Sequence, residues 1–212
     1  MRIRVLIADD HAIVREGLKQ IIADSPDIVV AGEADTGLGA IELIRQQSFD
    51  VLLLDISMPD KNGIDVLKQV KQEKPTLPVL MLSMHREDQY AIRALKAGAA
   101  GYLNKQGAPT ELVDAVHDVA AGRKYITPAL AQELARQVGQ DSERLPHESL
   151  SDREFQTMIL IASGNSVTDI AEQLNLSVKT ISMYRARLLQ KLALRHNAEL
   201  TRYAMRHRLV NE

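Results

Sequence analysis

The chain has 212 residues, a formal net charge of −2, and 45% hydrophobic and 25% charged residues, as in an ordinary globular protein. It contains no cysteine, which excludes disulfides, thiolate metal sites and cysteine nucleophiles. No apolar stretch approaches the roughly 20 residues of a membrane span, and no signal-peptide pattern precedes the first strand, so we expect a cytoplasmic protein with no membrane partner.

The charge is distributed unevenly along the chain. Residues 1–148 carry 17 Lys and Arg against 22 Asp and Glu, whereas residues 149–212 carry 9 against 6. Between Ser177 and Arg208 there are eight basic residues and a single acid, Glu199. This asymmetry predicts two domains with different partners, although a solvated basic helix face would give the same count.

Strand and helix patterns alternate over residues 1–122. Short apolar runs predict strands, and the amphipathic segments that follow them predict helices. The expected strands are 3–8, 28–34, 50–55, 78–83 and 100–105. The expected helices are 12–23, 37–47, 63–73, 87–97 and 109–121. Five such units predict an α/β fold with a doubly wound, five-stranded parallel sheet of order 2-1-3-4-5 and helices on both faces.

Residues 123–148 are predicted to be a linker that contains one helix. Thr127-Pro128 predicts the start of a helix over 127–138, and residues 139–148 are polar, charged and interrupted by proline. Residues 149–212 predict a small all-α domain with helices near 152–163, 167–174, 178–192 and 197–207. Only Asn175-Leu176-Ser177 separate the second and third of these, which is typical of a helix-turn-helix.

Polar residues lie at the carboxyl ends of four predicted strands, namely Asp9, Asp10, Asp55, Ser83 and Lys105. In the expected strand order these ends converge at one edge of the sheet. Clustered carboxylates repel one another unless a cation neutralises them, and Mg²⁺ prefers such oxygen ligands. Asp55 can then attack phosphorus, with Lys105 and the metal neutralising the phosphoryl group and the Ser83 hydroxyl donating to it. Taken singly, Asp10 as a helix cap, Ser83 in a turn and Lys105 at a solvated strand end remain alternatives.

Residues 1–122 resemble the receiver domain of two-component response regulators. The matching positions are Ala8-Asp9-Asp10, Asp55-Ile56-Ser57-Met58-Pro59 with Gly63, Ser83, and Gly101-Tyr102-Leu103-Asn104-Lys105. The resemblance implies that a cognate sensor histidine kinase phosphorylates Asp55. It also implies that Ser83 and Tyr102 form the switch pair that reorients when phosphate binds, with packing of an amphipathic ring as the alternative for Tyr102.

The same resemblance implies a metal site. In it, Asp10, Asp55 and the backbone carbonyl of Ser57 ligate Mg²⁺ or Mn²⁺, and Asp9 acts through water. An aspartyl phosphatase of the haloacid-dehalogenase type is the alternative, but such enzymes carry a second Asp two residues after the nucleophile, where this chain has Ser57. No G-x-x-x-x-G-K-[ST] nucleotide loop is present either, so we do not expect an enzyme.

The predicted helix 178–192 is the candidate DNA-reading helix. Ile181, Leu188 and Leu192 fall on one side and are expected to pack against other helices. The remaining surface mixes basic, polar and apolar residues, which suits phosphates and base edges. The predicted DNA contacts are Lys179, Thr180, Ser182, Met183, Tyr184, Arg185, Ala186, Arg187 and Lys191. Packing within the domain remains an alternative for Met183 and Tyr184.

Residues 150–210 resemble the helix-turn-helix of the NarL/FixJ (LuxR-type) class. The matching positions are Leu150-Ser151-Asp152-Arg153-Glu154, Ala162-Ser163-Gly164-Asn165, Asp169-Ile170-Ala171, Leu174, Leu176-Ser177, Lys179-Thr180-Ile181 and Lys191-Leu192. The resemblance implies a phosphorylation-activated transcription regulator that binds a double-stranded inverted-repeat site as a homodimer, with RNA polymerase as a further partner. It also implies that helix 197–207 helps to pair the domains, and that the unphosphorylated receiver masks the recognition helix.

The candidate recognition helix departs from the family pattern at one place. Many relatives have Val-Lys-x-His where this chain has Ile181-Ser182-Met183-Tyr184, so the operator sequence of a relative does not transfer. A protein-interaction module, with a docking receiver and a regulatory helical tail, is the alternative from a different functional class. The eight-to-one charge ratio of the tail argues against that alternative.

Overall fold

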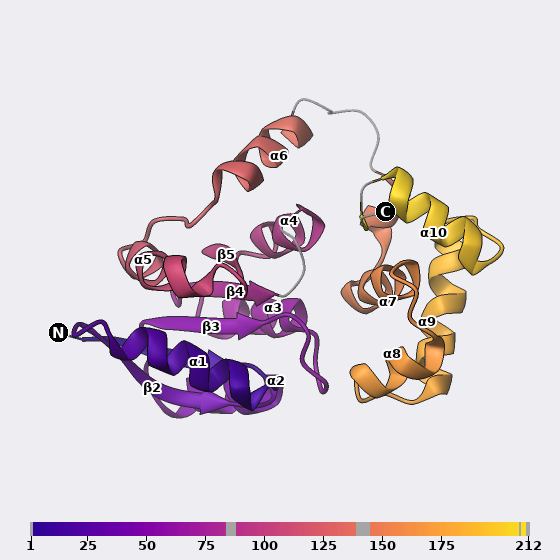
Figure 1. The fold of residues 1–212 in the computed structure, drawn as a ribbon. Helices are drawn as coiled ribbons and strands as arrows, with labels where there is room; N and C mark the ends of the chain where they lie inside the picture. The colour runs from indigo at the N-terminus through magenta and orange to yellow at the C-terminus, as the bar shows by residue number, and fades with distance from the viewer. Residues whose placement is uncertain (1, 84–87, 139–144, 208, 211–212) are drawn as a thin grey trace. The chain divides into compact units, whose positions relative to one another are not determined.

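The computed structural model describes residues 2–83, 88–138, 145–207 and 209–210. The chain divides into two compact units, Met1–Gly139 and Gln140–Glu212 (Figure 1), and each is described by itself. In the described part of the chain, none of the helices combines the length and the apolar character that crossing a membrane requires.

The first unit is built on a five-stranded sheet of order β2-β1-β3-β4-β5 in which all four neighbouring pairs are parallel. The strands are β1 (Ile3–Ala8), β2 (Ile28–Ala34), β3 (Val51–Asp55), β4 (Val79–Ser83) and β5 (Gly101–Asn104). The predicted α/β class, strand order and strand positions are therefore confirmed. Every residue of β3 and β4 is buried, which explains why both read as almost continuous apolar runs.

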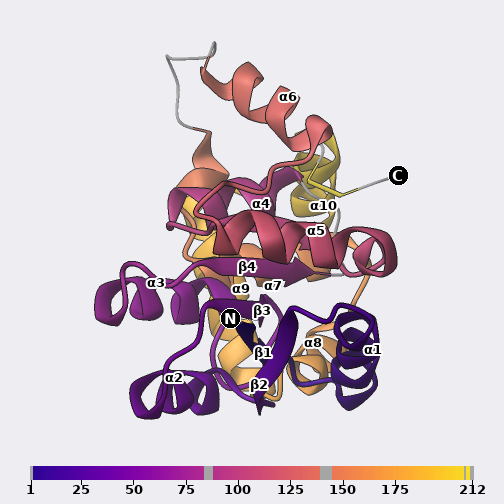
Figure 2. The same cartoon turned by 90° about the vertical axis from the view of Figure 1, so that its left-hand side faces the viewer.

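Five helices cover the sheet, and their predicted positions are confirmed to within a residue or so. They are α1 (Ala12–Ala23), α2 (Gly37–Gln46), α3 (Gly63–Glu73), α4 (Asp88–Lys96) and α5 (Ala108–Ala120). Residue 87, the first of the predicted helix 87–97, lies outside the described residues. Helices α1 and α5 lie on one face, and α2, α3 and α4 lie on the other (Figures 1 and 2).

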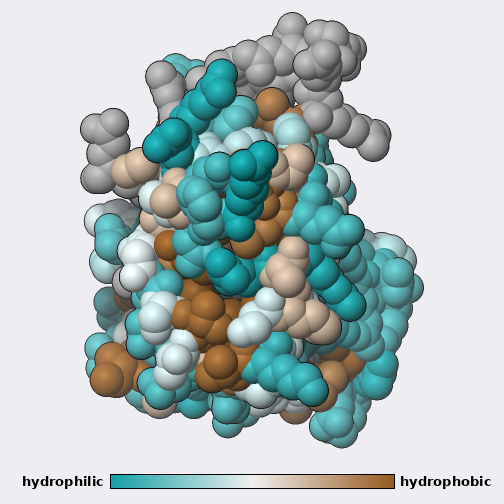
Figure 3. Space-filling model, turned by 90° about the vertical axis from the view of Figure 1, so that its right-hand side faces the viewer, coloured by the Kyte–Doolittle hydropathy of each residue, from teal (hydrophilic) through white to brown (hydrophobic). Residues whose placement is uncertain are grey.

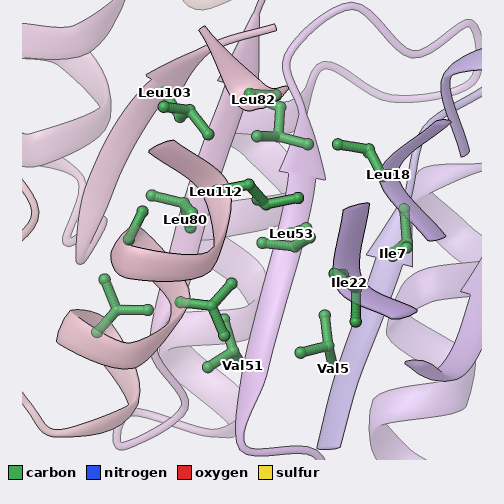
Figure 4. Packing of buried hydrophobic residues seen from close by; sticks show 14 of the residues in the cluster. Val5, Ile7, Leu18, Ile22, Val51, Leu53, Leu80, Leu82, Leu103 and Leu112 are labelled. Carbon is green, nitrogen blue, oxygen red and sulfur yellow. The ribbon is translucent and has the colours of Figure 1, made fainter. Parts of the chain in front are cut away.

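The core between the sheet and the α1–α5 layer holds the strands in place. Leu53 and Leu80 of the sheet lie beside Leu112 of α5 (Figure 4), Leu18 of α1 belongs to the same cluster, and all four are buried. Burying one such side chain contributes roughly 1.5–3 kcal/mol. The apolar side chains between the strands and these two helices therefore fix the positions of the carboxyl ends of the strands.

Residues that follow α5 return to the free edge of β5. The Tyr125 backbone N–H donates to the Ala100 carbonyl at 3.0 Å, and the Tyr125 hydroxyl donates to Glu111 Oε2 at 2.7 Å. A Cβ on Gly101 would lie 2.7 Å from the backbone carbonyl oxygen of Tyr125, so glycine permits this close approach. Next comes α6 (Pro128–Val138), which contacts α4. Residues 123–138 of the segment predicted as a linker thus belong to the first unit, and residues 139–144 lie outside the described part of the chain.

The second unit is helical, as predicted. It contains a short 3₁₀ helix (Pro146–Ser149), α7 (Asp152–Ala162), α8 (Val167–Gln173), α9 (Val178–Lys191) and α10 (Asn197–Arg206). Both predicted capping boxes are present, formed by Ser151 with Glu154 and by Ser166 with Asp169. His147 of the 3₁₀ helix is 1% exposed and its Nδ1 lies 3.0 Å from the Tyr203 hydroxyl of α10, so the end of the expected linker packs in this unit.

Substitution of Gly63 tests how closely α3 approaches the end of β3. A Cβ at this position would lie 2.0 Å from the Asp55 backbone oxygen, so the backbone would have to shift. We expect Gly63→Ala to lower the free energy of unfolding of the first unit by about 3 kcal/mol, read from hydrogen exchange of the β3 amides. Gly17→Ala is the control, because nothing lies within 4 Å of its added Cβ and alanine stabilises a helix by about 1 kcal/mol over glycine. Unchanged β3 protection in Gly63→Ala would contradict the close approach.

Candidate functional site

Three strand ends bring two buried carboxylates and one ammonium together. Asp9 follows β1, Asp55 ends β3 and Lys105 follows β5. Lys105 Nζ lies 2.6 Å from Asp9 Oδ2 and 2.9 Å from Asp55 Oδ1, with the Asp9 and Asp55 side chains 0% and 2% exposed. The strand order thereby places Lys105 in direct contact with residues 96 and 50 positions earlier in the sequence.

The site carries an excess of negative charge. Burial raises the pKa of Asp55 to about 6, and Asp9 adds to the increase while Lys105 opposes it. Burial lowers the pKa of Lys105, but Asp55 and Asp9 outweigh this and raise it overall. A site that raises the pKa of both its acid and its base favours the binding of positive charge.

One carboxylate oxygen of Asp55 is left for a further partner. Asp55 Oδ2 is buried and has no hydrogen-bond partner among the described residues, whereas Asp10 Oδ1 lies 2.8 Å from Nδ1 of His11. One potential ligand atom from each of Asp9, Asp10, His11 and Asp55 lies within 4.8 Å of the others. Such an oxygen-rich cluster is typical of a Mg²⁺ site. His11 was not predicted as a site residue, and its only signal in the sequence is its place directly after two acids.

The loop between β3 and α3 is fixed at both ends. The Gly63 N–H donates to the Ile56 carbonyl at 2.8 Å, and the Asn62 side chain caps α3 by accepting from the Ile64 N–H. Asp60 accepts from the first two N–H groups of α2, those of Gly37 at 2.9 Å and of Leu38 at 2.8 Å. This loop carries Ser57, whose carbonyl is the expected metal ligand. Asp60 was not predicted, because its partners lie 22 and 23 residues away.

The expected switch residues Ser83 and Tyr102 both lie in the interior. Ser83 ends β4 and its carbonyl accepts from the Lys105 N–H at 2.8 Å, which ties the end of β4 to Lys105. Tyr102 lies in β5 and is completely buried. Its ring therefore packs in this conformation, while a change of orientation remains a prediction.

In the second unit, a sharp turn joins α8 to α9. Asn175 adopts a left-handed conformation with φ 49°, and the Leu176 N–H donates to the Ala171 carbonyl at 2.8 Å. Ser177 caps α9 by accepting from the Thr180 N–H at 3.0 Å. Helices α8 and α9 are thus joined as in a helix-turn-helix. The residues predicted to face the other helices, Ile181, Leu188 and Leu192, are buried as expected.

The face of α9 opposite these buried residues is mostly exposed. Lys179, Ser182, Met183, Ala186 and Arg187 are exposed, and Thr180 and Tyr184 are half-buried. Met183 is 41% exposed, so it does not occupy the core position considered as an alternative. Figure 3 shows one face of the molecule, on which brown hydrophobic patches lie among teal hydrophilic side chains. The mixture of basic, polar and apolar residues exposed on α9 suits contacts with both phosphates and base edges.

Two of the predicted DNA-contacting residues are engaged within the fold. Arg185 Nε donates to Asn197 Oδ1 of α10 at 2.6 Å, and Lys191 Nζ donates to Glu154 Oε2 of α7 at 2.6 Å. Burial of Glu154, which is 4% exposed, raises the pKa of its carboxyl, but Lys191 and Ser151 lower it overall. These two basic residues therefore stabilise the packing of α9 against its neighbours.

Comparisons with known proteins agree with this geometry. Residues 5–117 match the family model described as "Response regulator receiver domain", and residues 148–204 match "Bacterial regulatory proteins, luxR family". The chain belongs to the two-component response regulators that combine a receiver domain with a LuxR-type helix-turn-helix, the NarL/FixJ class. This family consists of transcription regulators rather than enzymes, so the phosphatase alternative is not supported.

Relatives match over nearly their whole length. Response regulator UvrY of Escherichia coli (strain K12) is 40% identical over 210 residues, covering 99% of this chain and 96% of UvrY. Response regulator GacA of Pseudomonas aeruginosa is 37% identical, covering 99% and 98%. A structure of RcsB from Salmonella enterica serovar Typhimurium, bound to promoter rprA in the presence of the phosphomimetic BeF3⁻, is 30% identical with a TM-score of 0.65, covering 96% and 98%.

The pairing of Lys191 with Glu154 can be tested through stability. Lys191→Met leaves a buried carboxylate without its cation, so we expect it to lower the free energy of unfolding of the second unit by about 1–2 kcal/mol, a figure that allows for the partial exposure of Lys191. Hydrogen exchange of the α7 amides measures this unit alone. The matched control is Arg187→Met, an exposed basic residue on the same helix, for which we expect a change within about 0.5 kcal/mol. Equal effects of the two substitutions would contradict a structural role for Lys191.

Proposed function

We propose that this response regulator is a phosphorylation-activated, DNA-binding transcription regulator whose phosphoryl acceptor is Asp55. The observation that carries the proposal is the Asp55 carboxylate, buried beside Lys105 with one oxygen that lacks a partner among the described residues. Residues 1–122 would form the receiver, 123–148 the linker and 149–212 the DNA-binding domain. A protein that meets both a kinase and DNA would act in the cytoplasm.

The phosphoryl donor would be a phosphohistidine of the cognate sensor kinase. A carboxylate oxygen of Asp55 attacks phosphorus, the P–O bond forms as the P–N bond breaks, and the electron pair of the broken bond stays on the imidazole nitrogen. The Lys105 ammonium neutralises charge on the phosphoryl oxygens. Mg²⁺ or Mn²⁺, held by Asp10, Asp55 and the Ser57 carbonyl with Asp9 acting through water, would supply further positive charge there.

Phosphorylation would then shift a two-state equilibrium of the receiver. The Ser83 hydroxyl would donate to a phosphoryl oxygen, and Tyr102 would reorient as the end of β4 rearranges. Because Ser83 and Lys105 are already joined through the backbone, a contact at either one would affect both strand ends. The shift would release the DNA-binding face and favour a homodimer.

The acceptor assignment is tested with a small phosphodonor. We expect the full chain with Mg²⁺ and phosphoramidate to gain one phosphoryl group by intact mass, and we expect Asp55→Asn to gain none because it lacks the nucleophilic carboxylate. Asp50→Asn is the matched control, since this acid lies immediately before the other end of β3 and should leave labelling unchanged. Labelling of Asp55→Asn at another residue would overturn the assignment.

The second unit would bind double-stranded DNA through α9 at an inverted-repeat site. Its exposed residues, Lys179, Ser182, Met183, Ala186 and Arg187, would lie closest to the DNA. Thr180, Tyr184, Arg185 and Lys191 would contribute at the margins, the last two while they keep their partners within the fold. Support comes from RcsB, a relative solved in complex with a promoter. Helix α10 would help to pair two such domains, and RNA polymerase would be a further partner.

A phosphate contact by Arg187 would show in the salt dependence of DNA binding. We expect Arg187→Ala to weaken binding to a duplex and to reduce the slope of log K against log salt by about 1, because one fewer counterion is released. Arg123→Ala is the control, as this exposed arginine of the first unit pairs with Asp118. An unchanged slope in Arg187→Ala would remove Arg187 from the phosphate contacts.

A further inference from the structure

The exposed face of α9 has apolar side chains at its centre. Met183 and Ala186 are both exposed and lie three residues apart, which places them on the same face of the helix. The core positions of α9 are filled by other residues, namely Ile181, Leu188 and Leu192. Met183 is 41% exposed, so its side chain contributes little to the core of the second unit. A single exposed apolar residue is ordinary on a protein surface, and its surroundings decide what it can bind.

Positive charge lies on both sides of Met183. Lys179 is one turn before it and Arg187 is one turn after it, and both are exposed. The other two basic residues of α9, Arg185 and Lys191, are bonded within the fold, and the helix contains no Asp or Glu. An apolar side chain between two cations suits a polyanion that also offers apolar contacts, as the major groove of DNA does.

The chemistry of the base edges determines what Met183 and Ala186 can read. In the major groove, thymine alone presents an apolar group, its C5-methyl, and the other edges present hydrogen-bond donors and acceptors. Neither side chain has a hydrogen-bond donor, and the thioether of methionine is only a weak acceptor. Against a polar base edge they would displace water without replacing its hydrogen bonds. They therefore gain free energy only where a thymine methyl group lies opposite them.

We propose that Met183 reads DNA by packing against a thymine C5-methyl group, so that each half-site bound by this chain contains a thymine opposite the centre of α9. Ala186 extends the same apolar surface, and Lys179 and Arg187 hold the helix in the groove from either side. The inference rests on the proposed binding of DNA through α9 and adds to it the base that is read and the side chain that reads it. The alternative is that the two cations read guanine.

Replacement of thymine by deoxyuridine tests the contact, because it removes the methyl group and leaves the hydrogen-bonding groups of the base unchanged. The full chain, with Mg²⁺ and phosphoramidate, first selects a duplex from random sequences, and each thymine of that duplex is then replaced in turn. We expect one thymine in each half-site whose replacement weakens binding about fourfold, the factor that corresponds to one buried methylene group. Replacement of both should weaken binding about 15-fold, since well-separated contacts are additive.

Met183→Ala separates this contact from any effect of uracil on the DNA itself. The variant is expected to fold, because Met183 is exposed and alanine favours a helix. We expect the same uracil replacement to weaken binding by Met183→Ala less than about twofold, and by Met205→Ala still about fourfold. Met205 is the matched control, since it is 40% exposed but lies on α10. Only the ratio of the affinities for thymine and uracil duplexes is compared, so a change in overall affinity does not affect the result.

The outcomes distinguish the inference from the function beneath it. If no uracil replacement weakened binding by the unsubstituted chain, or if the loss were equal in Met183→Ala, the role of Met183 would be overturned and DNA binding through α9 would stand. A loss with a guanine analogue that lacks N7, without any loss with uracil, would assign the reading to Lys179 and Arg187 instead. If the chain selected no duplex at all, the proposed DNA binding would fail together with the inference.

Discussion

The contact of the Lys105 ammonium with Asp9 and Asp55 is the interaction on which the first unit depends. Two carboxylates buried at neighbouring strand ends repel each other, and the energy of that repulsion is large where water is excluded. Lys105 reaches both from β5, although β4 lies between β5 and β3. The strand order, the buried strands β3 and β4 and the α1–α5 core all serve to hold these three groups in register.

One ammonium does not balance the acids around it, and this imbalance links structure to chemistry. Burial raises the pKa of Asp55, the neighbouring acids add to that increase, and the carboxylates of Asp55 and Asp9 raise the pKa of Lys105. A divalent cation would relieve this excess and a bound phosphoryl group would restore it, so phosphorylation would change the charge next to Lys105, whose backbone N–H donates to the Ser83 carbonyl. The receiver is therefore suited to convert a covalent modification into a rearrangement of strand ends.

Local patterns in the sequence predicted the fold well, because residues close together in the sequence determine where each strand or helix forms. Apolar runs marked β3 and β4, and Ser151 and Ser166 with the acids three residues later marked the starts of α7 and α8. The convergence of Asp9, Asp55 and Lys105 followed from the strand order. Partners that depend on tertiary packing could not be predicted in this way.

The missed partners share this long-range character. Asp60 bonds to the start of α2, Tyr125 pairs with the edge of β5, and His147 packs in the second unit. Lys191 was predicted to contact DNA from its charge and its place on the flank of the helix, and this contact stays a prediction. The sequence did not predict that its ammonium binds a glutamate 37 residues earlier. Basic residues on a helix surface look alike in a sequence, and only the fold separates those that pair internally from those that face outward.

Selection of genomic DNA fragments by the purified full chain, with Mg²⁺ and with or without a small phosphodonor, tests the central claim most directly. The account predicts enrichment of a common inverted-repeat sequence that is stronger when the donor is present. Equal enrichment with and without donor would contradict control of DNA binding by Asp55, and no enrichment in either condition would contradict DNA binding itself.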